Sequence, residues 1–339
     1  MLPTRRTMAV ALVPPILITA GCGAEVKEAA DNSSSSATIT SCGVQTSVKR
    51  PTTPVAYDMS AIEKMFALGL APDMKIVLPA TANSSAKRST FNKDYAATPK
   101  IGDDVLSQEQ VVAAKSDWVF AGWQAGFSPE RGITPASLKK LDIGSYIQQE
   151  TCFNYDKGKT AGKPVAPGSH YALENTYADL TNLGAIFGVQ DKAKKLVTSL
   201  KKRASELTER PERTATPDVF VYDSGTTDPY TSGRRTAPQD IIDLAGGRNI
   251  GEKIDARWAT MGWESVAKAD PDVIVVIDYD DTPVKDKIAY LRNQSPIKNS
   301  PAVKNNHIHV MDYGKAVSGP RNLDAAEELS AYFDKKGFK

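Results

Sequence analysis

The feature that most constrains the fold is a set of short apolar runs that alternate with helical patterns. The clearest run extends from Val273 to Ile277 and is apolar on both faces of the expected strand. Such strands are typical of parallel sheets that carry helices on both sides. The helical patterns are also regular, since Ile62, Met65 and Phe66 share one face of the segment 60–68. This alternation predicts an α/β fold.

The expected strands form two groups with a long strand-free stretch between them. The first group is residues 54–57, 75–78, 117–120 and 145–147, and the second is residues 218–222, 272–277 and 307–311. The stretch between them, residues 171–209, is rich in helical patterns. Its second half predicts a helix of about 19 residues, or roughly 28 Å, which is long enough to connect two lobes.

We therefore expect two Rossmann-like lobes with a ligand cleft between them, joined by one long rigid helix. The expected boundaries are an N-terminal lobe over residues 42–170, a helical region with the bridging helix over 171–210, and a C-terminal lobe over 211–339. In this arrangement the carboxyl ends of both sets of strands face the cleft.

Residues 1–21 have the pattern of a secretory signal. Arg5 and Arg6 precede an apolar stretch, 8–20, which is too short to cross a bilayer as a helix. The stretch ends at Thr19-Ala20-Gly21-Cys22, which resembles the lipobox of bacterial lipoproteins and would make Cys22 the lipidated first residue. A secreted protein with a free Cys22 is the alternative. Residues 22–41, small and polar, are expected to form a flexible tether.

The two other cysteines, Cys42 and Cys152, would then lie outside the cytoplasm. Disulfides persist in that environment. We predict that these two residues form a disulfide, with two buried thiols as the alternative.

The charges are balanced, with 42 Lys and Arg against 40 Asp and Glu. Loss of the signal removes Arg5 and Arg6 and no acidic residue, which makes the two totals equal. Because nucleic-acid binders need a basic surplus, no nucleic-acid partner is expected. Three His and three Cys are too few for most all-protein metal cages, so we expect no metal site and no resident cofactor. A metal pair at His307 and His309, on one face of a strand, is the alternative.

Several motifs resemble, in order and spacing, those of one known family. They are residues 55–58 with 62–69 (VAYD and IEKMFALG), 107–117 (SQEQVVAAKSD), 178–180 (ADL), 244–250 (LAGGRNI), 263–266 with 270–274 (WESV and DPDVI) and 300–305 (SPAVKN). Over about residues 42–335, the chain resembles the periplasmic-binding-protein family of iron–siderophore and vitamin B12 ABC importers, the type with a single interlobe helix.

The resemblance implies a binding protein and not an enzyme. It implies a monomeric lipoprotein, outside the cytoplasm and anchored to the bacterial cell membrane, that captures a ferric siderophore or similar iron chelate. It would deliver this ligand to an ABC permease dimer with its ATPase. Haem, cobalamin or another cofactor-like molecule, such as a deazaflavin precursor, is the alternative ligand. The resemblance also implies that Glu109 and Glu264, at matching places in two motifs, dock onto the permease. The alternative is that both only favour a helix N-terminus.

Ligand-binding candidates lie in loops that follow strands, because ligands of open α/β sheets bind beyond the carboxyl ends of the strands. Aromatic rings offer stacking, and guanidinium groups pair with anionic oxygens. The expected ligand-binding residues are Tyr57, Trp123, Tyr230, Arg234, Arg235, Arg257, Trp258, Tyr313 and Arg321. Asp58 lies in the same region. This mixture suits an anionic ferric chelate, while each arginine has the alternative of a solvated surface charge.

The distant alternative is a serine hydrolase of the penicillin-binding type. Ser137 and Ser199 each stand three residues before a lysine, as the S-x-x-K motif requires. The sequence lacks the accompanying S-D-N and K-T-G motifs, and it also lacks G-x-S-x-G, P-loop and dinucleotide-binding patterns. A lipid-anchored adhesion or scaffold protein is a third class, for which small molecules would not change the tryptophan fluorescence.

Overall fold

A computed structural model describes residues 36–155, 168–279 and 282–339. Its first sheet has five strands, β3 (Pro54–Tyr57), β4 (Lys75–Val77), β5 (Lys100–Gly102), β6 (Trp118–Ala121) and β7 (Gly144–Ile147). They pair in parallel in the order β5-β4-β3-β6-β7. The sequence predicted four of these strands. It did not predict β5, which is a three-residue edge strand without a buried residue.

Helices cover the first sheet and connect its strands. They are α1 (Asp58–Ala67), α2 (Asn83–Arg88), α3 (Asn92–Ala97), α4 (Gln108–Ala113), α5 (Pro135–Lys139) and α6 (Cys152–Tyr155). Helix α4 begins with a capping box, in which the Ser107 hydroxyl accepts from the Gln110 amide and the Gln110 side chain accepts from the Ser107 amide. Helix α1 is buried from Asp58 to Phe66, so it packs against protein on all sides.

The second sheet repeats this design with four parallel strands. They are β8 (Asp218–Tyr222), β10 (Arg248–Asn249), β12 (Val273–Asp278) and β13 (Ile308–Asp312), in the order β10-β8-β12-β13. Its helices are α9 (Ala237–Leu244), α10 (Trp263–Ala269), α11 (Val284–Asn293), α12 (Pro301–Lys304), α13 (Tyr313–Ala316) and α14 (Asn322–Lys335). A separate antiparallel pair joins β9 (Tyr230–Ser232) to β11 (Trp258–Thr260). The mixed α/β class with parallel sheets agrees with the prediction from the sequence.

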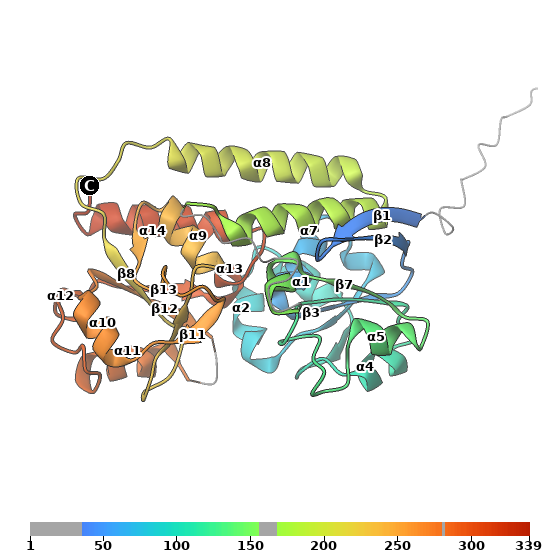
Figure 1. The fold of residues 1–339 in the computed structure, drawn as a ribbon, viewed down its shortest axis with the longest axis horizontal. Coiled ribbons are helices and arrows are strands. Elements are labelled where there is room, and N and C mark those ends of the chain that lie inside the picture. The colour runs from blue at the N-terminus through green and yellow to red at the C-terminus, as the bar shows by residue number, and fades with distance from the viewer. Residues whose placement is uncertain (1–35, 156–167, 280–281) are drawn as a thin grey trace, which may run out of the picture. The chain divides into compact units, whose positions relative to one another are not determined.

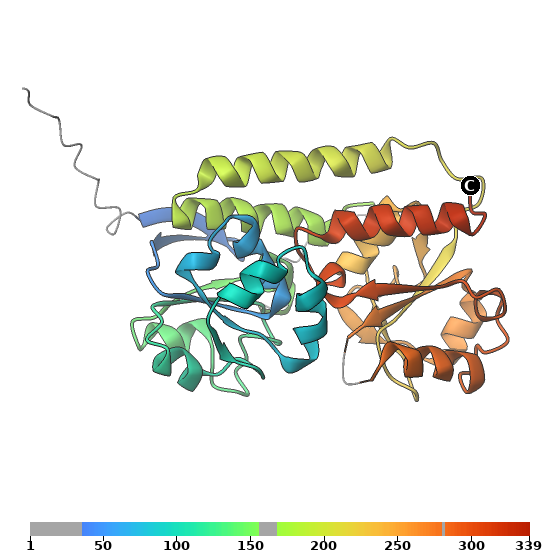
Figure 2. The same cartoon turned by 180° about the vertical axis from the view of Figure 1, so that it is seen from behind.

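Two long helices lie between the sheets in the sequence. Helix α7 (Tyr171–Phe187) ends at Gly188, whose φ of +71° is favourable for glycine, and α8 (Gln190–Thr208) follows. We call the described residues up to 155 the first half of the protein and those from Asp218 onwards the second half. Helix α8 packs along α7 and also contacts α9 and α14 of the second half. Figures 1 and 2 show α8 running over both α7 and α14. The predicted long helix therefore contacts both halves of the protein.

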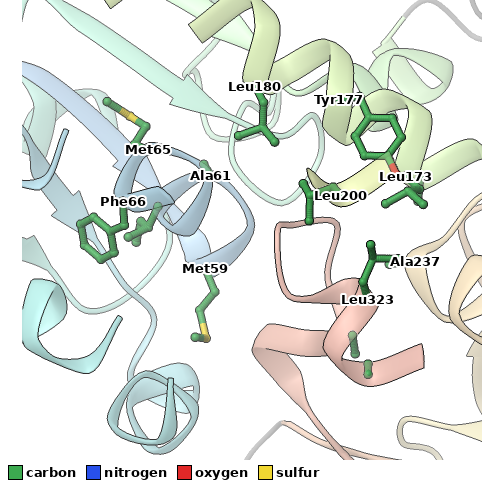
Figure 3. Packing of buried hydrophobic residues seen from close by; sticks show 14 of the residues in the cluster. Met59, Ala61, Met65, Phe66, Leu173, Tyr177, Leu180, Leu200, Ala237 and Leu323 are labelled. Carbon is green, nitrogen blue, oxygen red and sulfur yellow. The ribbon is translucent and has the colours of Figure 1, made fainter. Parts of the chain in front are cut away.

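The largest buried apolar cluster is continuous between the two halves. Met59, Met65 and Phe66 of α1 belong to the same cluster as Leu180 of α7 and Leu323 of α14. Figure 3 shows these side chains together with residues of α8 and α9. Dense packing of this kind resists deformation. Each sheet also has a buried cluster of its own, which includes Val55 and Val119 in the first sheet and Phe220 and Ile274 in the second.

The N-terminal part of the described chain differs from the expected tether over residues 22–41. Strand β1 (Ser36–Ser41) pairs antiparallel with β2 (Val44–Lys49), and Ile39 is buried in the core. β1 also packs against α7. Residues 36–41 are therefore part of the fold and not of a tether. The signal segment, Cys22 and the rest of the expected tether lie outside the described residues.

Candidate functional site

The carboxyl ends of the strands define the candidate site in both sheets. In the first sheet the chain winds from β3 to β4 and β5 on one side, and then to β6 and β7 on the other. The second sheet has a similar reversal, with β10 on one side of β8 and with β12 and β13 on the other. Ligands of open α/β sheets bind at such switch points. Tyr57 is the last residue of β3, and Asp223 and Tyr279 directly follow β8 and β12, so all three lie at these strand ends.

A cavity of about 300 Å³ lies at these strand ends and has walls from both halves of the protein. Its residues from the first half are Tyr57, Asp58, Ser60, Gly122, Trp123, Gln124, Ala125, Gln148, Glu150 and Thr151. Its residues from the second half are Asp223, Tyr230, Arg257, Trp258, Ile277, Tyr279, Tyr313, Val317 and Ser318. A wall that combines aromatic and apolar side chains with polar groups is typical of small-molecule sites.

Aromatic side chains stack in pairs on the wall from the second half. The rings of Tyr230 and Trp258 lie 5.9 Å apart at an angle of 22°, and they come from the paired strands β9 and β11. The rings of Tyr279 and Tyr313 are 3.9 Å apart at 20°. Because each ring supports its neighbour, these faces are held ready to stack against a flat or apolar ligand group.

The wall from the first half is held by close backbone packing. Gly126 lies in the turn after β6, where an added Cβ would come within 2.6 Å of the Ala121 Cβ and 3.2 Å of the Tyr57 ring. Glycine thus allows this turn to pass directly beside Tyr57. The Trp123 amide donates to the Thr151 hydroxyl at 2.8 Å, which fixes the start of the same turn against the loop after β7.

Polar contacts join the two halves across the cavity. The Tyr313 hydroxyl donates to Asp58 Oδ2 at 2.8 Å, and Arg257 Nε donates to Glu150 Oε1 at 3.2 Å. Burial raises the pKa of Asp58, although Tyr313, the Met59 amide and Arg257 oppose this effect. Burial also acts to lower the pKa of Arg257, but the Glu150 carboxylate together with Tyr171 and Tyr230 outweighs it, and the pKa is raised. Arg257 is therefore a cation that already has an anionic partner.

The structure brings together six of the nine predicted ligand-binding residues. Tyr57, Trp123, Tyr230, Arg257, Trp258 and Tyr313 all line the cavity. Trp258 was expected in a loop, but it begins the short strand β11. Their contact with a ligand stays a prediction.

The other three predicted residues, all arginines, do not line the cavity. Arg321 is 3% exposed and donates from Nε and Nη2 to the Glu63 carboxylate at 2.7 and 2.8 Å. Arg235 pairs with Asp255 and lies 3.9 Å from the centre of the Phe153 ring. Arg234 Nε donates to the Glu252 carbonyl. Expecting these side chains in the cleft was therefore wrong, since each one holds other parts of the fold together.

Several cavity residues were not predicted from the sequence. Glu150 and Gln148 follow β7, Asp223 follows β8, and Tyr279 follows β12. The rule that ligand sites lie after strands would have found all four of them. The sequence-based prediction relied on aromatic residues and arginines, and apart from Asp58 it did not include the carboxylates and amides at equivalent places.

The remaining predicted residues lie away from the cavity. Glu109 and Glu264 are exposed in the first turns of α4 and α10. His307 Nδ1 lies 3.1 Å from the Asp272 carbonyl, and His309 packs on the Tyr332 ring. Within the described ranges, no three His, Cys, Asp or Glu residues gather closely enough to hold a metal ion.

Comparisons with known proteins agree with this architecture. The family model described as "Periplasmic binding protein" matches residues 55–313. An "Uncharacterized ABC transporter substrate-binding lipoprotein YvrC" of Bacillus subtilis is 25% identical over 83% of this chain and 80% of its own length. An ABC-type Fe3+-hydroxamate transport system structure from Saccharomonospora viridis has a TM-score of 0.69 at 22% identity, covering 87% of this chain and 98% of that one.

A periplasmic heme-binding protein from Pseudomonas aeruginosa has a TM-score of 0.63 at 20% identity, covering 85% of this chain and 94% of that one. At these identities the solved structures establish the fold alone. The match of the family model covers most of the chain, and proteins of this family bind substrates and do not catalyse reactions. This chain therefore belongs to the periplasmic binding protein family and is a substrate-binding protein of an ABC importer, a class that works with a permease and an ATPase.

Proposed function

We propose that this protein captures a ferric siderophore or similar iron chelate and delivers it to its permease. The observation that carries the proposal is the aromatic cavity at the switch points of both sheets. Stacked tyrosine and tryptophan faces suit the apolar outer surface of a wrapped chelate, and polar groups between them can orient it. The likeness to an Fe3+-hydroxamate transport structure supports the same ligand class.

Haem or cobalamin is the second candidate for the ligand. It is favoured by the likeness to a heme-binding protein and by the Tyr279–Tyr313 stack, which offers a flat face and two hydroxyl groups. At about 300 Å³, the cavity is at the lower end of the usual range for ligand sites. A large macrocycle would therefore remain partly outside it.

Tryptophan fluorescence tests the ligand class directly. Trp123 and Trp258 line the cavity, while Trp118 and Trp263 are buried elsewhere. A ligand in the cavity should quench the emission, and Trp258→Phe should remove most of that quench while keeping part of the affinity. The titrants are ferric hydroxamates, ferric catecholates, ferric citrate, haem and cobalamin, with iron-free chelators as controls.

The outcomes separate the candidates. Quenching by haem or cobalamin alone would reject the iron chelate and keep the receptor. If no compound binds, the proposed cavity is not a ligand site for any of these classes.

We also propose that the mature protein is held at the membrane by lipid on Cys22. The support is the sequence Thr19-Ala20-Gly21-Cys22 behind a secretory pattern. Among the described residues, no helix combines the length and apolar character needed to span a bilayer. Palmitate labelling of cells should mark the wild-type protein, while Cys22→Ala should be unlabelled and released into the medium. Equal retention of both at the membrane would reject the anchor.

A further inference from the structure

The charged groups on the cavity wall are mainly acidic. Asp58, Glu150 and Asp223 line it, and Arg257 is the only Lys or Arg among the lining residues that the structure describes. Arg257 is already paired with Glu150.

Two further cations are close by but are bound to backbone. Arg131 donates to the carbonyls of residues 124–126, and Lys287 donates to those of Asp223, Ile277 and Tyr279. The sequence-based expectation of several arginines around an anionic ligand therefore does not describe this wall.

Two carboxylate oxygens on this wall have no hydrogen-bond partner within the described parts of the chain. They are Asp58 Oδ1 and Glu150 Oε2. The two residues are only 9% and 2% exposed, so bulk water does not solvate these oxygens well. A buried polar atom without a partner costs on the order of 1–3 kcal/mol, and more when it is charged. Such an atom needs an explanation, and for a residue that lines a cavity one explanation is a ligand that supplies the missing contact.

The backbone holds Asp58 in an unusual conformation at this place. Its φ is +66°, a region that residues other than glycine rarely occupy, and it lies between the end of β3 and the first turn of α1. Tyr313 of the opposite half holds its other oxygen, Oδ2. Glu150 is held in the same way, because Arg257 of the opposite half occupies only Oε1. In both residues one oxygen is anchored by the opposite half, and the other is buried beside the cavity without a hydrogen-bond partner among the described residues.

We propose that the ligand carries an N–H donor, an ammonium or an amide group, which Asp58 Oδ1 and Glu150 Oε2 accept. The inference rests on the proposed function, since it concerns the ligand of the same cavity. It assigns the ligand class more narrowly: a neutral or cationic chelate with a terminal nitrogen group fits, whereas an anionic catecholate or citrate complex would face two carboxylates. A donor to an ionised acceptor forms a strong, charge-assisted hydrogen bond.

A matched pair of ligands tests the proposal without altering the protein. Ferric desferrioxamine B ends in a free ammonium group, and its N-acetylated form has a neutral amide in the same place. Isothermal titration of the wild-type protein should give affinity for the ammonium form about 10- to 150-fold higher if charge is required. Equal affinity for the two forms, with loss in the variants below, would assign the amide N–H as the recognised donor.

Isosteric variants test the two acceptors. Asp58→Asn and Glu150→Gln should each weaken binding by about 10-fold or more, whereas Glu206→Gln, on the exposed face of α8, should change nothing. The asparagine variant also tests the opposite role: if Asp58 were protonated and donated to the ligand, the amide would still donate and affinity would be kept. Thermal unfolding of each variant shows whether its fold is intact.

The results distinguish failure of this inference from failure of the proposed function. If a chelate, haem or cobalamin binds and both variants keep its affinity within about twofold, the inference is wrong and the receptor assignment stands. Preference for ferric catecholate or citrate over both forms of ferrioxamine would also overturn it. If no compound binds to the wild-type protein, the proposed function fails and the inference fails with it. With cobalamin as the only ligand, loss of affinity in both variants would support recognition of its amide groups.

Discussion

Two oppositely charged neighbours, Glu63 and Lys64, lie on the buried helix α1 with 1% and 0% exposure. Each has a separate partner far away in the sequence. Lys64 Nζ is 2.7 Å from Asp179 Oδ2 of α7, and Glu63 forms a bidentate ion pair with Arg321. Removing one partner of a buried pair leaves an uncompensated charge in a dry environment. The Glu63–Arg321 contact therefore affects stability more than a surface pair would.

Arg321→Ala should lower the free energy of unfolding by about 3–5 kcal/mol. The control is Arg248→Ala, which breaks an exposed pair with Asp218 and should cost about 0–1 kcal/mol. Urea unfolding followed by circular dichroism measures both. The opposite pattern, normal stability with strongly reduced ligand affinity, would return Arg321 to the ligand site.

The case of Arg321 also shows what the sequence can predict at this scale. Tyr57 and Tyr313 could be predicted at the cavity because Tyr57 ends β3 and Tyr313 directly follows β13, and the apolar patterns of both strands are visible in the sequence. Arg321 follows the last strand too, but its partner Glu63 is 258 residues away along the chain. No local pattern indicates such a contact, so the direction of the guanidinium group could not be predicted.

At the scale of elements, the hairpin of β1 and β2 is attached to the first sheet through its turn. The turn residues are Cys42 and Gly43, with φ values of +46° and +77°. Cys42 forms the predicted disulfide with Cys152, the first residue of α6, and its amide lies 3.3 Å from Gln149 Oε1. The bond closes a loop of 110 residues. The chain-entropy estimate for such a loop is about 4–5 kcal/mol.

Removing this bond should therefore lower stability substantially. Cys42→Ser with Cys152→Ser should unfold at lower urea concentration, with a loss of up to about 4–5 kcal/mol. Alkylation of the unreduced wild-type protein should label neither residue. Two reactive thiols, or a double variant as stable as the wild type, would contradict the structural role.

The same hairpin explains a limit of element prediction. Residues 36–41 are mostly Ser and Thr, a composition that indicates a linker. They form a strand because β2 supplies a complete antiparallel ladder and Ile39 reaches the core. The long parallel strands β8, β12 and β13 were predicted because their apolar runs are visible without knowledge of any partner. Short strands that depend on their pairing were missed.

At the scale of the whole domain, the shared apolar cluster joins the two parts of the fold that carry the two candidate docking residues. Glu109 lies in the first turn of α4 near the first sheet, and Glu264 lies in the first turn of α10 near the second. Figure 1 shows both helices on the side away from α8. Because α1, α7, α8 and α14 share one apolar cluster, we expect the separation of the two glutamates to change little when a ligand binds. A fixed separation would suit docking onto a permease dimer.

Replacing Glu109 and Glu264 together with Ala should leave ligand affinity unchanged and stop uptake. The physical reason is that both carboxylates are exposed and neither lines the cavity, so their loss should not change contacts with the ligand. Each single replacement should reduce uptake partially, since one half would remain attached. Glu206→Ala on α8 is the control for losing an exposed carboxylate. Uptake of labelled ligand by cells and titration of the purified variant measure the two effects separately.

Loss of affinity in the double variant would place these residues in ligand binding, and normal uptake would show that the permease does not depend on them.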